Sequence, residues 1–176
     1  MRILPLTLIL AMLGALASPD AAIAQTALTD IRAYLPISDR LATGGQVTYE
    51  QIPTLAEAGF EVVINLATAD EERNGREGFL VAQQGMTYVN IPVSWPEPSL
   101  EHLQQFFEVM RANQDRKVFV HCFANMRVSA FTYLYRTLEL KDADAAARAD
   151  LLKIWDPFTN EQSPQWRAFL ESARQR

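Results

Sequence analysis

A cysteine, a histidine and an arginine stand close together in the stretch KVFVHCFANMRVSAF, residues 117–131. Cys122 is the only cysteine of the chain, His121 precedes it, and Arg127 follows it after four intervening residues. A thiolate is a strong nucleophile, and one guanidinium can hold two oxygens of an oxyanion. The residue types therefore suit nucleophilic chemistry on a phosphate ester or another oxyanion. The plain alternative is a small cysteine of the core with polar neighbours.

The sequence around Cys122 predicts a strand before it and a helix after it. Residues 117–122 are an almost continuous apolar run, which is typical of a buried parallel strand, and residues 127–140 are predicted to be helical. Ligands of open parallel sheets bind beyond the carboxyl ends of the strands. The N–H groups at the start of a helix favour an anion, and they also favour a thiolate. The predicted anion-binding loop comprises Phe123, Ala124, Asn125, Met126, Arg127 and Val128.

Strand-like and helix-like segments alternate along the rest of the chain. Further strands are predicted at LATGG (41–45), EVVINLA (61–67) and TYVNIPV (87–93). Helices are predicted at residues 48–59, 99–113, 143–154 and 164–174, and residues 70–84 are predicted to be part loop and part helix. Such alternation indicates βαβ units. We expect an α/β fold in one domain, residues 25–176, with a central, mainly parallel sheet of four to five strands flanked by helices.

The first 24 residues have the pattern of a secretory signal peptide. A positive Arg2 is followed by an apolar run over about residues 3–17, and Ala22 and Ala24 form a small-x-small cleavage signal. The alternative, an uncleaved anchor, is disfavoured because the run is short for a membrane span. We expect cleavage after Ala24 and export across the inner membrane, into the periplasm in a Gram-negative host. A lone cysteine cannot form an internal disulfide there, so Cys122 needs another role.

Composition and charge limit the classes of partner. Apolar residues make up 49% of the chain and charged residues 21%, which is ordinary for a globular protein. The net charge of −5 argues against nonspecific binding of nucleic acid and, after signal cleavage, against docking on an anionic membrane. With one cysteine and no histidine pair or carboxylate cluster at metal-ligand spacing, neither a metal nor another cofactor is expected. The sequence carries no indication of an oligomeric state.

The motif VFVHC, followed by a short loop, an arginine and SAF, resembles the cysteine-dependent protein tyrosine and dual-specificity phosphatases. The segments YLPISDRLATGGQ, FEVVINLA, YVNIPV and PQWRAFL extend the resemblance over about residues 34–170. They look like an exported bacterial branch whose phosphatase-like domain is also found joined to β-lactamase-like hydrolases. The resemblance implies a phosphotyrosine-phosphatase-like fold and hydrolysis of phosphate monoesters through a cysteinyl-phosphate on Cys122. Arg127 and the loop amides would hold the phosphate.

The same resemblance assigns roles to further residues. Trp95-Pro96-Glu97 looks like the family's tryptophan-proline-aspartate loop with glutamate in place of aspartate, so Glu97 is the candidate general acid. In the dual-specificity register Trp95 takes that position instead, and Glu97 is a solvated loop residue. His121 is expected to shape the loop and help hold the thiolate. Ser129 is expected to donate to the sulfur and assist breakdown of the intermediate. Plain structural roles at a strand end and at a helix start are the alternatives for these two residues.

The loop departs from the family pattern in its length. The phosphatases have five residues between cysteine and arginine and usually a central glycine, whereas this chain has four residues there. Without a gap, Asn125 stands where glycine is usual, Val128 stands in the place of the arginine, and Ser129 matches the serine. Either Arg127 reaches back from one position early, or the loop is a residue shorter and suits a different or smaller anion. Asparagine adopts a left-handed conformation more readily than most residues, which softens the loss of glycine.

The short spacing leaves two other functions open. Rhodanese-type sulfurtransferases resemble the local pattern too, and Cys122 would then carry a persulfide. A module that binds an anion without turnover is the non-enzymatic alternative. Two arginines, Arg73 and Arg76, lie in the polar stretch DEERNGREG and are expected to be solvated, with a position at the edge of the pocket as the alternative. Two tryptophans, Trp155 and Trp166, are expected to pack in the core.

Overall fold

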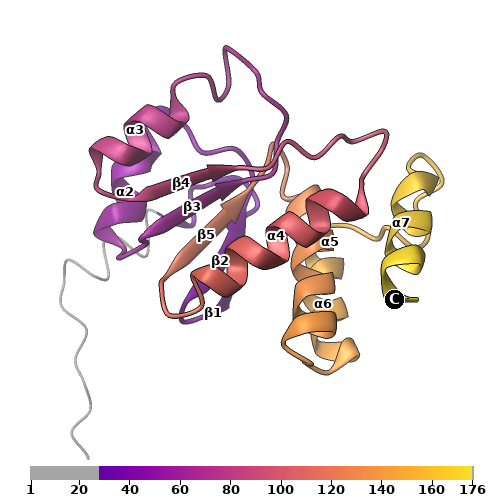
Figure 1. Ribbon diagram of the computed structural model, residues 1–176. Coiled ribbons are helices and arrows are strands. Elements are labelled where there is room, and N and C mark those ends of the chain that lie inside the picture. The colour runs from indigo at the N-terminus through magenta and orange to yellow at the C-terminus, as the bar shows by residue number, and fades with distance from the viewer. Residues whose placement is uncertain (1–27, 176) are drawn as a thin grey trace, which may run out of the picture.

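The computed structural model describes residues 28–175 and shows a five-stranded sheet flanked by helices (Figure 1). The signal peptide predicted for residues 1–24 lies outside the described residues and stays a prediction. The strands are β1 (Leu35–Ser38), β2 (Leu41–Gly44), β3 (Val62–Asn65), β4 (Thr87–Asn90) and β5 (Val118–His121). The helices are α2 (Ile52–Glu57), α3 (Glu77–Gln83), α4 (Leu100–Ala112), α5 (Met126–Leu134), α6 (Asp144–Ile154) and α7 (Pro164–Arg174).

The sheet has the order β1-β2-β5-β3-β4, which makes β5 its central strand. The neighbours β2, β5, β3 and β4 are parallel, and only the edge strand β1 runs antiparallel to β2. The expected mainly parallel α/β fold is confirmed. The register places Gly44 and Asn65 opposite His121, the last residue of β5. Strands β2, β3 and β5 therefore end at the same level, where the predicted loop follows β5.

Helices cover both faces of the sheet, and the side chains of β5 alternate between two cores. Val118 and Val120 join the larger core under α4, α5, α6 and α7, while Phe119 joins the smaller core under α2 and α3. Figure 1 shows these two groups of helices on opposite sides of the sheet. A strand that is buried on both faces reads as a continuous apolar run, which explains the pattern of residues 117–122.

Several boundaries differ from the predicted ones. A 3-10 turn at Tyr49–Gln51 precedes α2, so the α-helix proper starts later than Thr48. The helix predicted over residues 127–140 is α-helical only to Leu134 and ends in a π-helical turn, Tyr135–Glu139, in which the Leu140 N–H donates to the Tyr135 carbonyl at 3.1 Å. The predicted start of α4 is confirmed, because the Ser99 hydroxyl accepts the His102 N–H.

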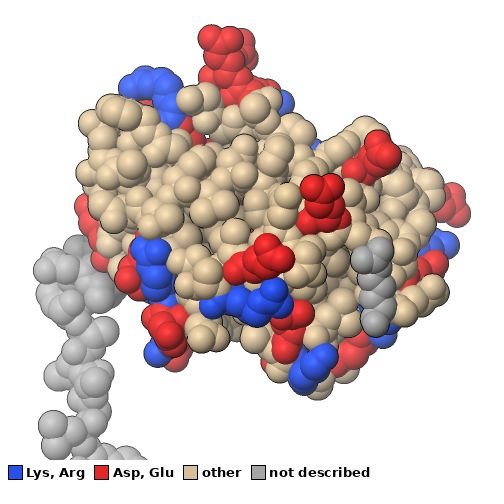
Figure 2. All heavy atoms as spheres, in the orientation of Figure 1, with Lys and Arg blue, Asp and Glu red and all other residues tan. Residues whose placement is uncertain are grey.

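Charged side chains are spread over the surface without large blocks of one sign on the face seen in Figure 2. There, lysine and arginine lie among aspartate and glutamate on a largely uncharged background. Within residues 28–175, no helix combines the length and the apolar character needed to cross a bilayer.

Candidate active site

The loop that carries Cys122 leaves the carboxyl end of the central strand. Cys122 follows β5 directly, and α5 starts at Met126. The Cys122 N–H donates to the Gly44 carbonyl at 3.3 Å, and the Phe123 carbonyl accepts from the Gln46 N–H at 3.4 Å. The Cys122 side chain is fully buried. The chain after β2 therefore runs beside the cysteine loop and supports it.

Asn125 makes the turn from this loop into α5. Its backbone is left-handed, with φ 61° and ψ −1°, and its carbonyl accepts the Ser129 N–H at 2.8 Å. The side-chain amide is buried and donates to the Ala33 carbonyl at 2.8 Å and to Thr43 Oγ1 at 3.0 Å. Asparagine thus takes the conformation for which glycine is the usual choice. The first N–H groups of α5 have no partner within the helix, so they are free to meet an anion in the loop.

Arg127 lies in the first turn of α5 and reaches the segment that follows β4. Its side chain is 9% exposed, and its Nε donates to the Val93 carbonyl at 2.9 Å. The guanidinium carbon lies 5.4 Å from the centre of the Trp95 ring and 5.7 Å from that of Phe123. The next residue, Val128, is fully buried in the larger core. Arg127, and not Val128, therefore joins the cysteine loop to the segment that carries the candidate acid.

Glu97 lies in an exposed turn, where its N–H donates to Ser94 Oγ at 3.3 Å. The turn is anchored two residues earlier by Trp95, whose ring centre lies 5.4 Å from that of Trp155 and 5.0 Å from that of Trp166. The Trp95 carbonyl also accepts from Trp166 Nε1 at 3.1 Å. The segment predicted to hold the general acid is thus fixed against α7, while the Glu97 side chain faces solvent.

Ser129 and Trp155 brace the start of α5. The Ser129 hydroxyl donates its one hydrogen to the Met126 carbonyl at 3.0 Å, and not to the Cys122 sulfur as the resemblance implied. Trp155 Nε1 points at the same two groups, 3.0 Å from the Met126 carbonyl and 3.2 Å from Ser129 Oγ. The prediction that Trp155 and Trp166 are buried is confirmed. The sequence did not indicate that Trp155 also holds the first turn of the helix that follows Cys122.

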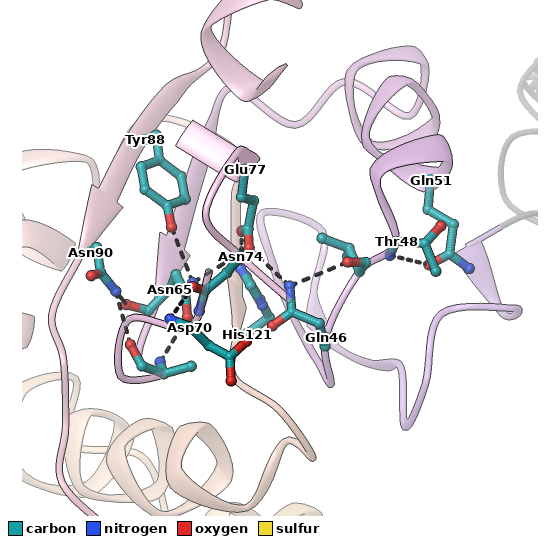
Figure 3. Close-up of polar contacts among 12 residues, drawn as sticks. Gln46, Thr48, Gln51, Asn65, Asp70, Asn74, Glu77, Tyr88, Asn90 and His121 are labelled. Atoms are coloured by element: carbon teal, nitrogen blue, oxygen red, sulfur yellow. Dashed lines mark hydrogen bonds and ion pairs between the residues drawn. The ribbon is translucent and has the colours of Figure 1, made fainter. Parts of the chain in front are cut away.

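A buried polar network lies behind the cysteine loop (Figure 3). His121 Nε2 lies 2.5 Å from Glu77 Oε1, and both side chains are fully buried. The contact is an ion-pair distance, although its angles are not those of an aligned hydrogen bond. The other carboxylate oxygen, Glu77 Oε2, accepts from Gln46 Nε2 at 2.9 Å and from Asn65 Nδ2 at 3.4 Å. Asn65 Nδ2 also donates to the Tyr88 hydroxyl at 3.0 Å. Sequence reasoning missed this network, which joins β4 and the ends of β3 and β5 to α3.

The Glu77 carboxylate contributes to a raised pKa of its neighbour Tyr88. Burial, and after it the nearby Glu77 carboxylate, raise the pKa of the Tyr88 hydroxyl to about 12. This tyrosine therefore stays protonated at neutral pH and can serve the network as an uncharged hydroxyl.

The polar stretch at residues 70–78 is only partly the solvated loop that was predicted. Arg76 is exposed, as expected, but Glu77 is fully buried. Arg73 is exposed as well, but its guanidinium carbon lies 3.8 Å from the centre of the Phe123 ring, so it borders the cysteine loop. Hydrogen bonds from Arg73 hold the pKa of the Asp70 carboxyl below its usual value. The stretch thus contributes one buried anion and one flanking cation to the site.

The described part of the chain holds no group of three or more histidine, cysteine, aspartate and glutamate side chains arranged to bind a metal ion. The charged and polar groups described at the site are the loop amides, Arg127, the flanking Arg73 and the network around Glu77.

Comparison with known proteins gives consistent matches. The family described as "DSP-PTPase phosphatase fused to NAD+ Kinase" matches residues 24–167. A crystal structure described as a DUF442 phosphatase from Shewanella putrefaciens CN-32 is 35% identical, with a TM-score of 0.73, and covers 83% of this chain and 91% of that one. A TpbA variant from P. aeruginosa, solved with pTyr, is similar in fold, with a TM-score of 0.61 over 81% of this chain and 88% of that one at 13% identity.

One curated relative is much longer than the matched region. The β-lactamase hydrolase-like protein of Agrobacterium fabrum is 31% identical over 107 residues, which are 58% of this chain and 25% of that protein. The match therefore concerns about a quarter of the relative, and the relative's whole activity does not follow from it.

Proposed function

Because this chain belongs to the phosphatase family described as fused to NAD+ kinase, we propose that it hydrolyses phosphate monoesters with Cys122 as the nucleophile. The observation that carries the proposal is the position of the thiol. Cys122 stands between the end of the central strand and the first turn of α5, and the adjoining Asn125 has the left-handed turn that curls the loop. An anion held there would meet the unpaired N–H groups of the helix start.

The proposed reaction has two steps. The Cys122 thiolate attacks phosphorus, a sulfur–phosphorus bond forms, and the ester oxygen leaves with the electron pair of the broken phosphorus–oxygen bond. Glu97 is proposed to give that oxygen its proton. A water molecule then attacks phosphorus and gives a proton back to Glu97, the sulfur–phosphorus bond breaks, and phosphate and the thiolate are released. Ser129 is proposed to assist this second step.

Arg127 is proposed to hold two phosphate oxygens in the transition state, together with the amides of residues 123–128. Two observations support this role. The guanidinium is largely buried next to Phe123, within the loop, and it is the charged side chain of that loop. In the structure its Nε donates to the Val93 carbonyl. Nη1 and Nη2 therefore remain as the groups that would bind phosphate.

We also propose that the protein is exported, with residues 1–24 as a cleaved signal peptide and the periplasm as its location. The support is the charged, apolar and small-residue pattern of that segment. N-terminal sequencing of the protein recovered from a periplasmic fraction tests this proposal. The expected first residue is Gln25, and a chain that keeps Met1 in a membrane fraction would contradict it.

The test of the proposed activity is hydrolysis of para-nitrophenyl phosphate and of phosphotyrosine by the purified, reduced protein, beside Cys122→Ser. Phosphotyrosine is included because the similar TpbA variant was solved with it. We expect turnover that the serine variant abolishes. Persulfide transfer from thiosulfate without ester hydrolysis would favour the sulfurtransferase alternative, which is based on the four-residue spacing. Phosphate binding without turnover would favour an anion-binding module.

A further inference from the structure

Glu77 is an unusual residue for a protein interior. Its carboxylate is fully buried, and burial of a charged group is costly unless the charge is paired and hydrogen-bonded. Both oxygens have polar neighbours. Oε2 accepts from Gln46 and Asn65, and Oε1 faces His121 Nε2. Figure 3 shows that these side chains converge on Glu77 from separate segments of the chain.

The contact brings together two complementary groups. A carboxylate oxygen accepts, and an imidazole nitrogen that carries hydrogen donates, so Glu77 Oε1 is a suitable partner for His121 Nε2 at this 2.5 Å distance. Glu77 thereby limits where the imidazole ring can lie. The imidazole is also held from its other side, because it stacks on Phe119 with ring centres 5.8 Å apart at 11°.

His121 is joined directly to the thiol residue. It precedes Cys122, and its carbonyl accepts the Leu66 N–H at 2.8 Å at the end of β3. The backbone bond to β3 and the side-chain contact with Glu77 thus hold the residue from which the Cys122 loop departs at two separate points. In metal sites and catalytic triads, the partner that orients a functional histidine sets both its tautomer and its direction.

We propose that Glu77 is a positioning residue for the phosphatase reaction, which acts through His121 on the Cys122 loop. This inference rests on the proposed function. It adds a residue from a part of the chain, residues 70–78, whose sequence is typical of a solvated loop.

The test is Glu77→Gln, which keeps the shape of the side chain. Its single oxygen can still accept from Gln46 and Asn65, but an uncharged NH2 group then takes the place of the carboxylate oxygen that faces His121 Nε2. We expect kcat on para-nitrophenyl phosphate to fall about 10- to 100-fold, by analogy with the loss seen when the partner that orients a metal-binding histidine is removed. KM should change little. The matched control is Glu72→Gln, the same substitution at an exposed position of the same segment, which should leave kcat unchanged.

A double-mutant cycle with His121→Gln shows whether Glu77 acts through the histidine. If it does, Glu77→Gln costs little more once His121 is replaced. Losses that multiply in the double variant would overturn the proposal, as would an unchanged kcat in the single variant. Urea unfolding of each variant checks that it folds. If Glu77→Gln does not fold, Glu77→Asp is carried through the same cycle, because its shorter side chain withdraws the carboxylate from His121 Nε2, and a loss of kcat that depends on His121 is again expected.

Alkylation of Cys122 by iodoacetamide separates this inference from the proposed function. The chain has one cysteine, so the mass of the protein reports on that thiol alone. We expect Glu77→Gln to be alkylated more slowly than the wild type at neutral pH. The double variant should be alkylated at the same rate as His121→Gln alone. An unchanged rate would contradict the role of Glu77. If Cys122→Ser keeps phosphatase activity, the proposed function fails, but the alkylation cycle still decides whether Glu77 controls the thiol.

Discussion

The left-handed turn at Asn125 can be tested by replacing the residue with glycine and with alanine. Either change removes the buried amide that donates to the Ala33 carbonyl and to Thr43 Oγ1. Only alanine also places a β-carbon on a backbone with φ 61°. The two variants therefore separate the energy of the hydrogen bonds from the energy of the turn.

The magnitudes follow from these contacts. Two lost hydrogen bonds at about 1 kcal/mol each give about 2 kcal/mol of destabilisation for both variants. Alanine in the left-handed region costs roughly 1 to 2 kcal/mol more. Glycine has more freedom in the unfolded chain, which offsets part of that difference. After the larger freedom of glycine in the unfolded chain is subtracted, we expect Asn125→Ala to be less stable than Asn125→Gly by about 1 kcal/mol.

Urea unfolding followed by tryptophan fluorescence measures both free energies, because three tryptophans are present. In parallel, Asn125→Gly should keep more activity on para-nitrophenyl phosphate than Asn125→Ala, since glycine preserves the path of the loop. An alanine variant as stable as the glycine variant would refute the left-handed turn. Two variants as stable as the wild type would show that the amide bonds contribute no net stability.

Two further substitutions probe the supports of the site. The folded state raises the pKa of Tyr88 from 10.0 to about 12, so the unfolded chain loses this proton first and the free energy of unfolding falls as pH rises from 10 towards 12. Tyr88→Phe should remove about 1 kcal/mol of that fall at pH 11, after allowance for the partly exposed ring. Urea unfolding at pH 9 and pH 11 gives the two free energies, and an equal fall in the wild type and in Tyr88→Phe would contradict the prediction. Trp155→Phe removes the donor shared by Met126 and Ser129. We expect a loss of about 1 to 2 kcal/mol and a lower kcat, and a variant with unchanged stability and kcat would show that the brace is unimportant.

The central strand and its loop could be predicted because their signals are local. A run buried on both faces of a sheet is apolar throughout, as in Val118–His121. The left-handed turn at Asn125 was compatible with the sequence, because asparagine adopts that conformation readily where the family usually has glycine. The edge strand β1 was not predicted. It is four residues long, contains Pro36 and has an irregular register with β2, so it lacks a clear alternating pattern.

The polar network could not be predicted because its parts are far apart in the chain. Glu77 stands among charged residues that are mostly exposed, and only the packing of α3 against β4 brings it to His121. The role of Trp155 is hidden for a similar reason. A buried tryptophan has the same sequence pattern whether its Nε1 braces a functional helix or another part of the core.

The most direct test of the proposed mechanism is to trap the covalent intermediate. The purified protein is mixed with para-nitrophenyl phosphate, quenched in acid within its first turnovers, and digested for mass spectrometry of the peptide that contains Cys122. The mechanism predicts one phosphoryl group on the Cys122 sulfur, absent from Cys122→Ser. Turnover with an unmodified Cys122, or with phosphate on another side chain, would contradict it.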